Sequence, residues 1–277
     1  MKKIILILFF LPIYSYANFI ALNNGARSLS MGNAFVALGN EPATIFSNPA
    51  GLAKINSFYF SGSHQNLYGI SDLHNDMLAI SFPTPIFRTG IGIQQVKLLD
   101  VYSEQIIYFS AASIIRIKNI PFRFGGSLKL ESAKVMNYEE AKNPSNFDVD
   151  FGVLVDFSDN FFFGYSVKYL LEPKFKFISK TDQLKRQMAT GICYNWRNSV
   201  NFLVDYSWSE NKSKWNFGSE IWFYDIFAAR LGMYDEKLTS GFGLKTNYWI
   251  FDAAVMSHQK LGSTYLISIG LLLGEQS

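Results

Sequence analysis

Residues 147–157 read FDVDFGVLVDF, and this stretch alternates strictly between two kinds of side chain. Its odd positions are all Phe or Val, whereas its even positions carry three aspartates, a glycine and a leucine. Successive side chains of a β-strand point to opposite faces of the sheet, so this period of two predicts a strand with one apolar and one acidic face. A strand of this kind suits a membrane barrel, whose apolar face meets lipid and whose charged face lines the lumen.

The same alternation continues from residue 56 to the C-terminus, and helical spacing is absent there. Many of the runs span about 9 to 11 residues, the length that a tilted strand needs to cross a hydrocarbon core, whereas soluble strands average about five or six. The sequence predicts fourteen strands, at about 57–65, 76–82, 88–96, 104–114, 123–133, 147–157, 161–170, 187–194, 200–208, 215–223, 227–234, 239–246, 249–257 and 263–273.

The links between these runs differ in length. Those after odd-numbered strands are the longer ones, at 66–75, 97–103, 134–146, 171–186, 209–214, 235–238 and 258–262. Links after even-numbered strands are mostly tight turns, although 115–122 is an exception. Short periplasmic turns and long outer loops are typical of up-and-down membrane barrels. We therefore expect an all-β fold, an antiparallel transmembrane barrel of about 14 strands. The alternative, a soluble double-sheet protein, is disfavoured by the mid-strand carboxylates.

The N-terminus predicts export. Lys2 and Lys3 precede an unbroken apolar run over residues 4–11, and small residues follow up to Ala17. This pattern is typical of a secretory signal peptide, here residues 1–17 with cleavage near Ala17. The run is too short for a spanning helix, which needs about 20 residues. We therefore expect the mature chain in the outer membrane.

Composition excludes several classes of protein. The 277 residues carry a formal net charge of only +3, which gives no electrostatic footprint for nucleic acid. One cysteine excludes an intrachain disulfide framework and a multi-cysteine metal site. The three histidines stand alone in the sequence and no Gly-x-Ser-x-Gly motif is present, so we expect no enzyme activity and no cofactor.

Residues 18–55 lack the alternation and are rich in small residues. Residues 40–42, Asn-Glu-Pro, look like an N-cap followed by an acidic residue and a proline in the first turn of a helix. Asn48 before Pro49 ends that helix, because the residue before proline avoids the helical conformation. A fourteen-stranded barrel has a lumen too wide for wall side chains to fill, since about eight strands already reach that limit. We therefore predict that residues 18–55 plug a barrel formed by residues 56–277.

Two stretches of this segment, GARSLSMGNAFVAL at 25–38 and NEPATIFSNPAGLA at 40–53, resemble the N-terminal hatch of the FadL-type superfamily of outer-membrane proteins. That superfamily includes long-chain fatty-acid and aromatic-hydrocarbon transporters and the related PorV/PorQ-like barrels of the type IX secretion system. The resemblance identifies a hatch motif of Asn48, Pro49, Ala50, Gly32 and Arg27. It also implies that the third and fourth outer loops form a groove that captures ligand.

The fourth outer loop interleaves lysines with apolar residues, a pattern that suits an amphiphile with a carboxylate head. Attraction of the lysines to anionic lipopolysaccharide is the alternative. Inward-facing basic residues on the strands are further candidates for binding the head group, although interior charges more often pair with acidic neighbours. The candidate ligand-binding residues are Lys174, Phe175, Lys176, Phe177 and Lys180 in the loop and Arg123, Lys168 and Arg230 on the strands.

These expectations favour passive uptake or transfer of fatty-acid-like hydrophobic molecules, because no Walker-type nucleotide loop supplies energy. Gly90 and Gly92 in the third strand are candidates for a kink or side opening through which a ligand leaves, with ordinary strand glycines as the alternative. The alternative function is a PorV/PorQ-like barrel that docks secretion machinery or exported cargo. The expected partners are outer-membrane lipids, a hydrophobic small molecule or, under the alternative, secretion-system proteins.

Overall fold

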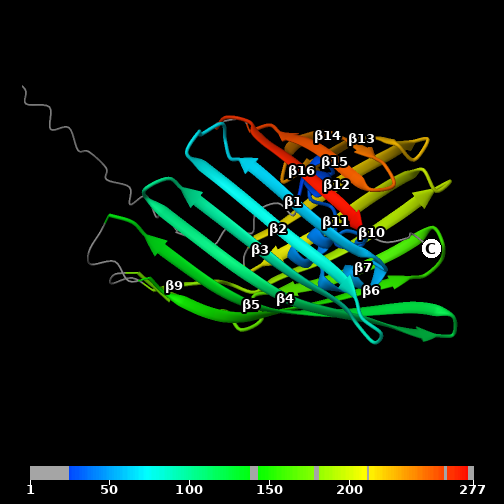
Figure 1. Ribbon diagram of the computed structural model, residues 1–277, viewed down its shortest axis with the longest axis horizontal. Helices are drawn as coiled ribbons and strands as arrows, with labels where there is room; N and C mark the ends of the chain where they lie inside the picture. Colours follow the sequence, from blue (N-terminus) through cyan, green and yellow to red (C-terminus); the bar gives the residue numbers. More distant parts are fainter. Residues whose placement is uncertain (1–24, 138–142, 178–180, 211, 259–260, 274–277) are drawn as a thin grey trace, which may run out of the picture.

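In the computed structural model, fourteen antiparallel strands close into a barrel (Figure 1). The structure describes residues 25–137, 143–177, 181–210, 212–258 and 261–273, so the predicted signal peptide lies outside the described residues. The wall strands are β1 (Phe58–Asn66), β2 (Leu73–Pro83), β3 (Arg88–Leu98), β4 (Tyr102–Ile117), β5 (Ile120–Val135), β6 (Ser145–Asp156), β7 (Phe161–Lys168), β10 (Gln187–Trp196), β11 (Val200–Ser209), β12 (Lys212–Phe223), β13 (Phe227–Tyr234), β14 (Lys237–Lys245), β15 (Trp249–Met256) and β16 (Thr264–Leu273).

The barrel closes between its first and last strands. β1 pairs with β16 from Phe58↔Leu273 to Asn66↔Tyr265, and every other wall strand pairs with its neighbours in chain order. β7 pairs directly with β10, because β8 (Lys174–Lys176) and β9 (Thr181–Gln183) form a separate hairpin in the link between them. The predicted all-β fold and its fourteen wall strands are confirmed. The β8–β9 hairpin was not predicted.

The two faces of the wall follow the predicted alternation. Phe147 is 61% exposed and Phe151 is 41% exposed on the outside of the barrel. Asp148 and Asp150, which lie between them in the sequence, are buried inside it. Outward side chains along the other strands are likewise large and apolar, and most inward ones are small, polar or charged. The ionised residues therefore face the lumen, as the period of two predicts.

We call the end of the barrel that holds the start of β1 and the finish of β16 the terminal end, and the opposite end the loop end. The β5–β6 and β7–β10 links at the loop end are the longest in the described wall. Three predicted long links are wrong, because β3–β4, β11–β12 and β13–β14 join through two or three residues. The predicted 115–122 link is also a tight turn, since Lys118 and Asn119 both adopt the left-handed conformation of a two-residue hairpin turn.

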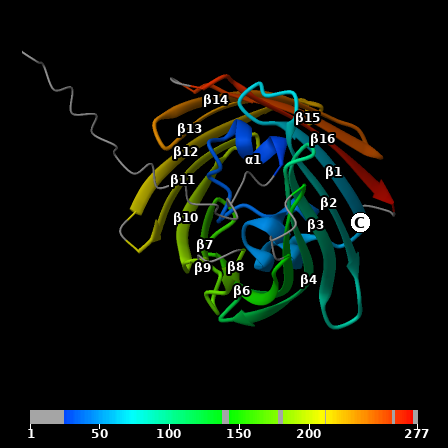
Figure 2. The ribbon, with the colours of Figure 1, turned by 90° about the vertical axis from the view of Figure 1, so that its left-hand side faces the viewer.

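Residues 25–55, which we call the inner segment, lie inside the ring of strands (Figure 2). They form α1 (Ala26–Ser30) and two short 3-10 helices, η1 (Pro42–Phe46) and η2 (Pro49–Lys54). The predicted cap of η1 is wrong by one residue: the N-cap is Glu41, while Asn40 has a φ of 80°. Among the described residues, no helix is long and apolar enough to cross a membrane.

Candidate functional site

At several points where the backbone of the inner segment meets the wall, the wall carries a glycine instead of a side chain. A Cβ atom on Gly125 would lie 2.4 Å from the backbone nitrogen of Ala50, and one on Gly164 would lie 2.2 Å from the carbonyl oxygen of Val36. Glycine permits such close approach of two backbones because it has no side chain. The inward glycines of β5 and β7 therefore form a seat that matches the path of the inner segment.

Gly90 and Gly92 belong to the same seat. A Cβ atom on Gly90 would lie 2.7 Å from Cδ1 of Ile45, and one on Gly92 would lie 3.0 Å from the ring of Phe46. β3 pairs with β2 and with β4 along its length, so its two ladders are unbroken at these glycines. In this structure the two glycines make room for η1 rather than opening the wall.

The hatch-motif residues hold the inner segment in this seat. Asn48 donates from Nδ2 to the carbonyl oxygens of Val36, at 2.8 Å, and Val153, at 3.1 Å. Its Oδ1 accepts from the backbone nitrogen of Ala50, so Asn48 begins η2 instead of only ending the preceding helix. Asn48 therefore joins two parts of the inner segment to β6, with Pro49 and Ala50 packed over Gly125.

Arg27 and Gly32 attach α1 to the opposite side of the wall. The Arg27 guanidinium donates to both carboxylate oxygens of Glu220 on β12, at 2.8 and 2.9 Å, and to Oδ1 of Asn40. Gly32 has a φ of 64° and donates its backbone N–H to Oγ1 of Thr239 on β14. A side chain at Gly32 would meet the carbonyl oxygens of β12 and β13, so glycine is required there.

A second carboxylate on the wall binds the backbone of the inner segment. Oδ2 of Asp205 on β11 accepts the N–H groups of Phe35, at 2.7 Å, and Val36, at 3.0 Å. Those two amides lie outside any helix, so a wall carboxylate supplies the partners that buried backbone groups require. Glu220 and Asp205 together fix both ends of the 27–36 stretch.

The predicted ligand-binding cations on the strands are engaged within the protein. Arg230 on β13 donates to Glu220 at 2.7 Å and to Asp252 at 2.6 Å. Arg123 on β5 pairs with Asp156 at 2.5 Å. Lys168 on β7 donates to the carbonyl oxygen of Phe46, at the end of η1.

A third group of charges lies on β5 and β6, where Asp148 and Asp150 also accept backbone N–H groups of the β7–β10 link. Nζ of Lys129 on β5 lies 3.2 Å from Glu131, 2.9 Å from Asp148 and 2.9 Å from Asp150. The ammonium also sits 3.7 Å from the ring centroid of Tyr169. Lys129 is only 1% exposed. One cation therefore holds three carboxylates of β5 and β6 together without touching the inner segment.

The structure separates the predicted loop residues. Phe175 on β8 is buried and belongs to the apolar cluster inside the barrel, whereas Lys174 and Lys176 on either side of it are exposed. Phe177 packs against Tyr102, with ring centroids 6.2 Å apart. Lys180 lies outside the described residues. The two lysines therefore face away from the phenylalanine between them and do not share one pocket with it.

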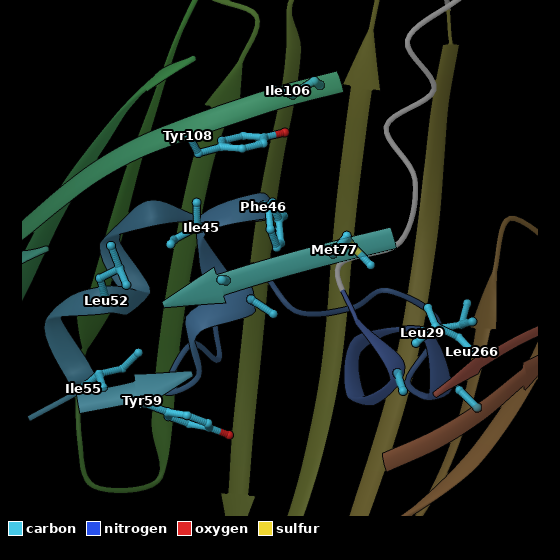
Figure 3. Close-up of a cluster of buried hydrophobic side chains, with 14 of the residues drawn as sticks. Leu29, Ile45, Phe46, Leu52, Ile55, Tyr59, Met77, Ile106, Tyr108 and Leu266 are labelled. Atoms are coloured by element: carbon cyan, nitrogen blue, oxygen red, sulfur yellow. The ribbon is translucent and has the colours of Figure 1, made fainter. Parts of the chain in front are cut away.

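A continuous apolar cluster joins side chains of the inner segment, such as Leu29, Ile45 and Leu52, to wall side chains around it, such as Met77 and Tyr108 (Figure 3). Phe46 of η1 packs edge-on against Tyr108 of β4, with ring centroids 5.1 Å apart. Further toward the loop end the cluster continues through Tyr169 to Phe175 and Leu184 of the β7–β10 link. We call this cluster the apolar column.

The terminal end holds a cavity of about 490 Å³ below the inner segment. Its lining includes Arg27, Glu41 and Lys54 of the inner segment and Arg230 of the wall. Burial raises the pKa of Glu41 to about 7, against the opposing effect of Arg27, whose guanidinium lies 3.6 Å away. Burial lowers the pKa of Lys54, and Asp156 opposes that shift.

Some of these residues were not assigned a role from the sequence. The sequence predicts only that inward cations pair with acidic neighbours, and it does not indicate that Glu220 and Asp205 bind the inner segment. The available signal was their position, since each is an acidic residue on the inward side of an alternating strand. Among the described residues, no group of three or more His, Cys, Asp or Glu side chains is placed to hold a metal ion.

No protein-family model and no curated protein sequence matches the chain. Solved structures do resemble it. The Ralstonia pickettii toluene transporter TbuX has a TM-score of 0.66 at 12% identity, over 93% of this chain and 100% of that one. The CymD monoaromatic hydrocarbon channel has a TM-score of 0.68 at 10% identity, over 94% and 100%. A Pseudomonas aeruginosa FadL homologue has a TM-score of 0.56 at 10% identity, over 89% and 97%. The chain therefore has the FadL-type barrel fold, as its N-terminal motif predicts.

Proposed function

We propose that this chain is an outer-membrane barrel for passive uptake or transfer of hydrophobic molecules such as fatty-acid-like amphiphiles. The outward band of exposed Phe, Leu and Ile side chains suits contact with acyl chains, and the inward charges suit a lumen. Residues 18–55 act as the plug of residues 56–277 in this proposal, after cleavage of residues 1–17. The similar solved structures include a toluene transporter and a monoaromatic hydrocarbon channel.

The apolar column is the observation that carries the proposal. A water-filled pore keeps a polar interior, whereas Phe46, Tyr108, Tyr169 and Phe175 belong to a buried apolar cluster in the loop-end half of this lumen, beside the ion pairs of Lys129. Such side chains exclude hydrated solutes and bind apolar ones, because burial of apolar surface is favourable. A hydrophobic molecule would advance by displacing these side chains, with the inner segment below as a seal.

The test is uptake of a radiolabelled long-chain fatty acid by a Gram-negative host strain that lacks its own fatty-acid transporter. Cells that carry the protein should take up the acid faster than cells with an empty vector, and should not admit a small hydrophilic dye. Phe175→Asp places a charge in the apolar column and should reduce uptake about tenfold, because an unpaired buried charge is costly. Lys174→Ala is the matched control on the opposite face of β8 and should leave uptake unchanged.

Two results would contradict the proposal. If the protein is present in the outer-membrane fraction and uptake equals that of cells with the empty vector, transport of the acid by this chain is excluded. Uptake of the dye together with the acid would indicate an open pore instead of a hydrophobic path. The PorV/PorQ-like alternative draws no support from the structural neighbours named above, and it predicts a stoichiometric protein partner in a pull-down from detergent extract.

A further inference from the structure

The β4–β5 hairpin projects past its neighbouring strands at the terminal end (Figure 1). The ladder between β4 and β5 continues to the pair Ile117↔Ile120. β3, in contrast, begins opposite Ala112, and the β5–β6 ladder ends at Phe122. Residues 113–122, which we call the ribbon, therefore extend beyond the closed wall as two strands that pair mainly with each other.

The outward face of the ribbon continues the apolar face of the wall. Ile115 and Ile117 lie on the same side of β4 as Phe109, because alternate residues of a strand share a face. Ile115 is 55% exposed and Ile117 is 52% exposed. Their register partners on β5 are Phe122 and Ile120. The outward face of the ribbon is therefore apolar on both strands.

The lengths of the apolar runs place the ribbon relative to a bilayer. On β4, every outward residue over 107–117 is apolar except one serine, and Gln105 before this run is polar. On β5, the outward residues over 120–130 are apolar or glycine, and Ser132 after this run is polar. Each run matches the roughly 9–11 residues that a tilted strand needs to cross a hydrocarbon core. Because both runs end at the β4–β5 turn, this turn lies where acyl chains give way to head groups.

Two unpaired cations lie at that boundary. The ribbon contains Arg116 and Lys118 and no acidic residue. Both side chains are exposed, and neither has a hydrogen-bond or ion-pair partner in the described part of the chain. The β6–β7 and β12–β13 turns at the same end instead carry Asp159 and Asp225. Long basic side chains can rest their stems on apolar surface and place their charge among lipid phosphates.

We propose that the ribbon binds anionic phospholipids of the periplasmic leaflet, with their acyl chains against Ile115 and Ile117 and their phosphates at Arg116 and Lys118. This inference rests on the proposed function, which places the terminal end with its short turns on the periplasmic side. Two cations without a protein counter-ion complement the negative charge of such head groups. The apolar face of the ribbon is continuous with the lipid-facing wall, which favours a lipid over a soluble protein partner.

The experiment counts lipids bound to the full chain by native mass spectrometry in non-ionic micelles. Wild type should bind phosphatidylglycerol more tightly than phosphatidylcholine. Arg116→Gln combined with Lys118→Gln should weaken binding of phosphatidylglycerol about thirtyfold, which corresponds to about 1 kcal/mol for each cation. Binding of phosphatidylcholine should be unchanged. Lys174→Gln combined with Lys176→Gln is the matched control, because it removes the same charge from two exposed lysines at the loop end.

A spin label then measures the depth of the ribbon in vesicles of phosphatidylglycerol and phosphatidylcholine. Cys193 is buried, so a nitroxide on Ile117→Cys reports on the ribbon alone. This label should collide with oxygen more often than with a water-soluble nickel chelate. A label on Ser158→Cys, in the exposed β6–β7 turn, should show the reverse.

Three results would overturn the inference. They are unchanged phosphatidylglycerol binding in the ribbon variant, an equal loss in the loop-end control, and equal access of nickel to the labels on Ile117→Cys and Ser158→Cys. If host cells still take up fatty acid in any of these cases, only the ribbon contact fails. If wild type neither inserts into vesicles nor supports uptake, the proposed function fails as well.

Discussion

Two buried clusters of ion pairs inside the barrel connect different parts of the molecule. One joins wall strands to each other, and the other joins the inner segment to the wall. In the wall cluster, Lys129 joins carboxylates that all belong to β5 and β6. In the plug cluster, Arg27 of α1 donates two hydrogen bonds to Glu220 of β12. Glu220 also accepts a hydrogen bond from Arg230 on the neighbouring strand β13. The wall cluster has one cation for three carboxylates, whereas the plug cluster shares Glu220 between two guanidinium groups.

The two clusters differ in how far the wall depends on a single cation. The wall cluster depends on Lys129, because its three carboxylates have no other cation within ion-pair distance among the described residues. In the plug cluster, Arg230 would still pair with Glu220, as well as with Asp252, if Arg27 moved away. Loss of the plug contact therefore leaves Glu220 and Asp252 with one cation, Arg230, while loss of Lys129 leaves three buried carboxylates with none. Release of the inner segment is compatible with an intact barrel.

The largest expected effect comes from Lys129→Met. It should lower the free energy of unfolding of the barrel by about 3–5 kcal/mol, because removal of one partner from a buried ion pair leaves uncompensated charge. Urea unfolding in detergent micelles, followed by far-UV circular dichroism, measures this loss. Lys118→Met, at the exposed β4–β5 turn, is the control and should change little. Equal stability of the two variants would show that the wall cluster is dispensable.

Arg27→Ala should act on the inner segment and spare the wall. It removes three charge-assisted hydrogen bonds and should weaken attachment of α1 by about 3 kcal/mol, since hydrogen bonds to charged groups contribute about 1.5–3 kcal/mol each and do not simply add. Hydrogen exchange should accelerate at the amides of Leu29 and Gly32, while the β5 and β6 amides keep their protection. A parallel loss of protection on β5 would mean that the two clusters are not independent.

Gly125→Ala tests whether η2 requires a wall position without a side chain, because it adds volume without changing any charge. The added methyl group would lie 2.4 Å from the backbone of Pro49 and Ala50, and such overpacking costs up to about 3 kcal/mol. Displacement of η2 should raise the ion conductance of the protein in planar bilayers. Gly126→Ala is the neighbouring control, because its nearest atom outside the chain neighbours lies at an ordinary 3.7 Å. Similar conductance of both variants would show that η2 tolerates the change.

The wall strands could be predicted from the sequence because the face of each side chain depends only on its position within one strand. The alternation in 147–157 and the other runs assigns each side chain to a face, and strand lengths follow from the same pattern. The tight β13–β14 turn was predicted as a longer link, because Asp235 and Glu236 adopt the left-handed conformation without a glycine to signal it. The β8–β9 hairpin was missed because three-residue strands carry too little alternation to detect.

The site was less predictable because it depends on contacts between distant positions. Gly90 and Gly125 look like ordinary strand glycines until the inner segment is placed against them. Arg27 was identified through the motif resemblance, but its partner Glu220 is 193 residues away in sequence. Alternation places Glu220 on the inward face without showing which cation it meets. A pattern along one strand therefore specifies the face of a residue and not its partner.

The smallest expected effect is a pH dependence of plug attachment through Glu41. Burial raises the pKa of this carboxyl from 4.5 to about 7. The attached state therefore holds the proton more tightly than a detached, hydrated state, so its full stability is present below 4.5 and is lost as the pH rises through 7. The linked change between pH 5 and pH 7 amounts to about 2 kcal/mol.

Hydrogen exchange at the amides of Thr44 and Ser47, which close the turns of η1, measures this change. After correction for intrinsic exchange, their protection in wild type should fall as the pH rises. Glu41→Gln keeps the side-chain size without a titrating proton, so its protection should stay level over the same range. Because Arg27 pairs with Glu41 as well as Glu220, the slope should steepen in Arg27→Ala. An identical slope in wild type and Glu41→Gln would assign the pH dependence to another group and leave the plug cluster without a titrating member.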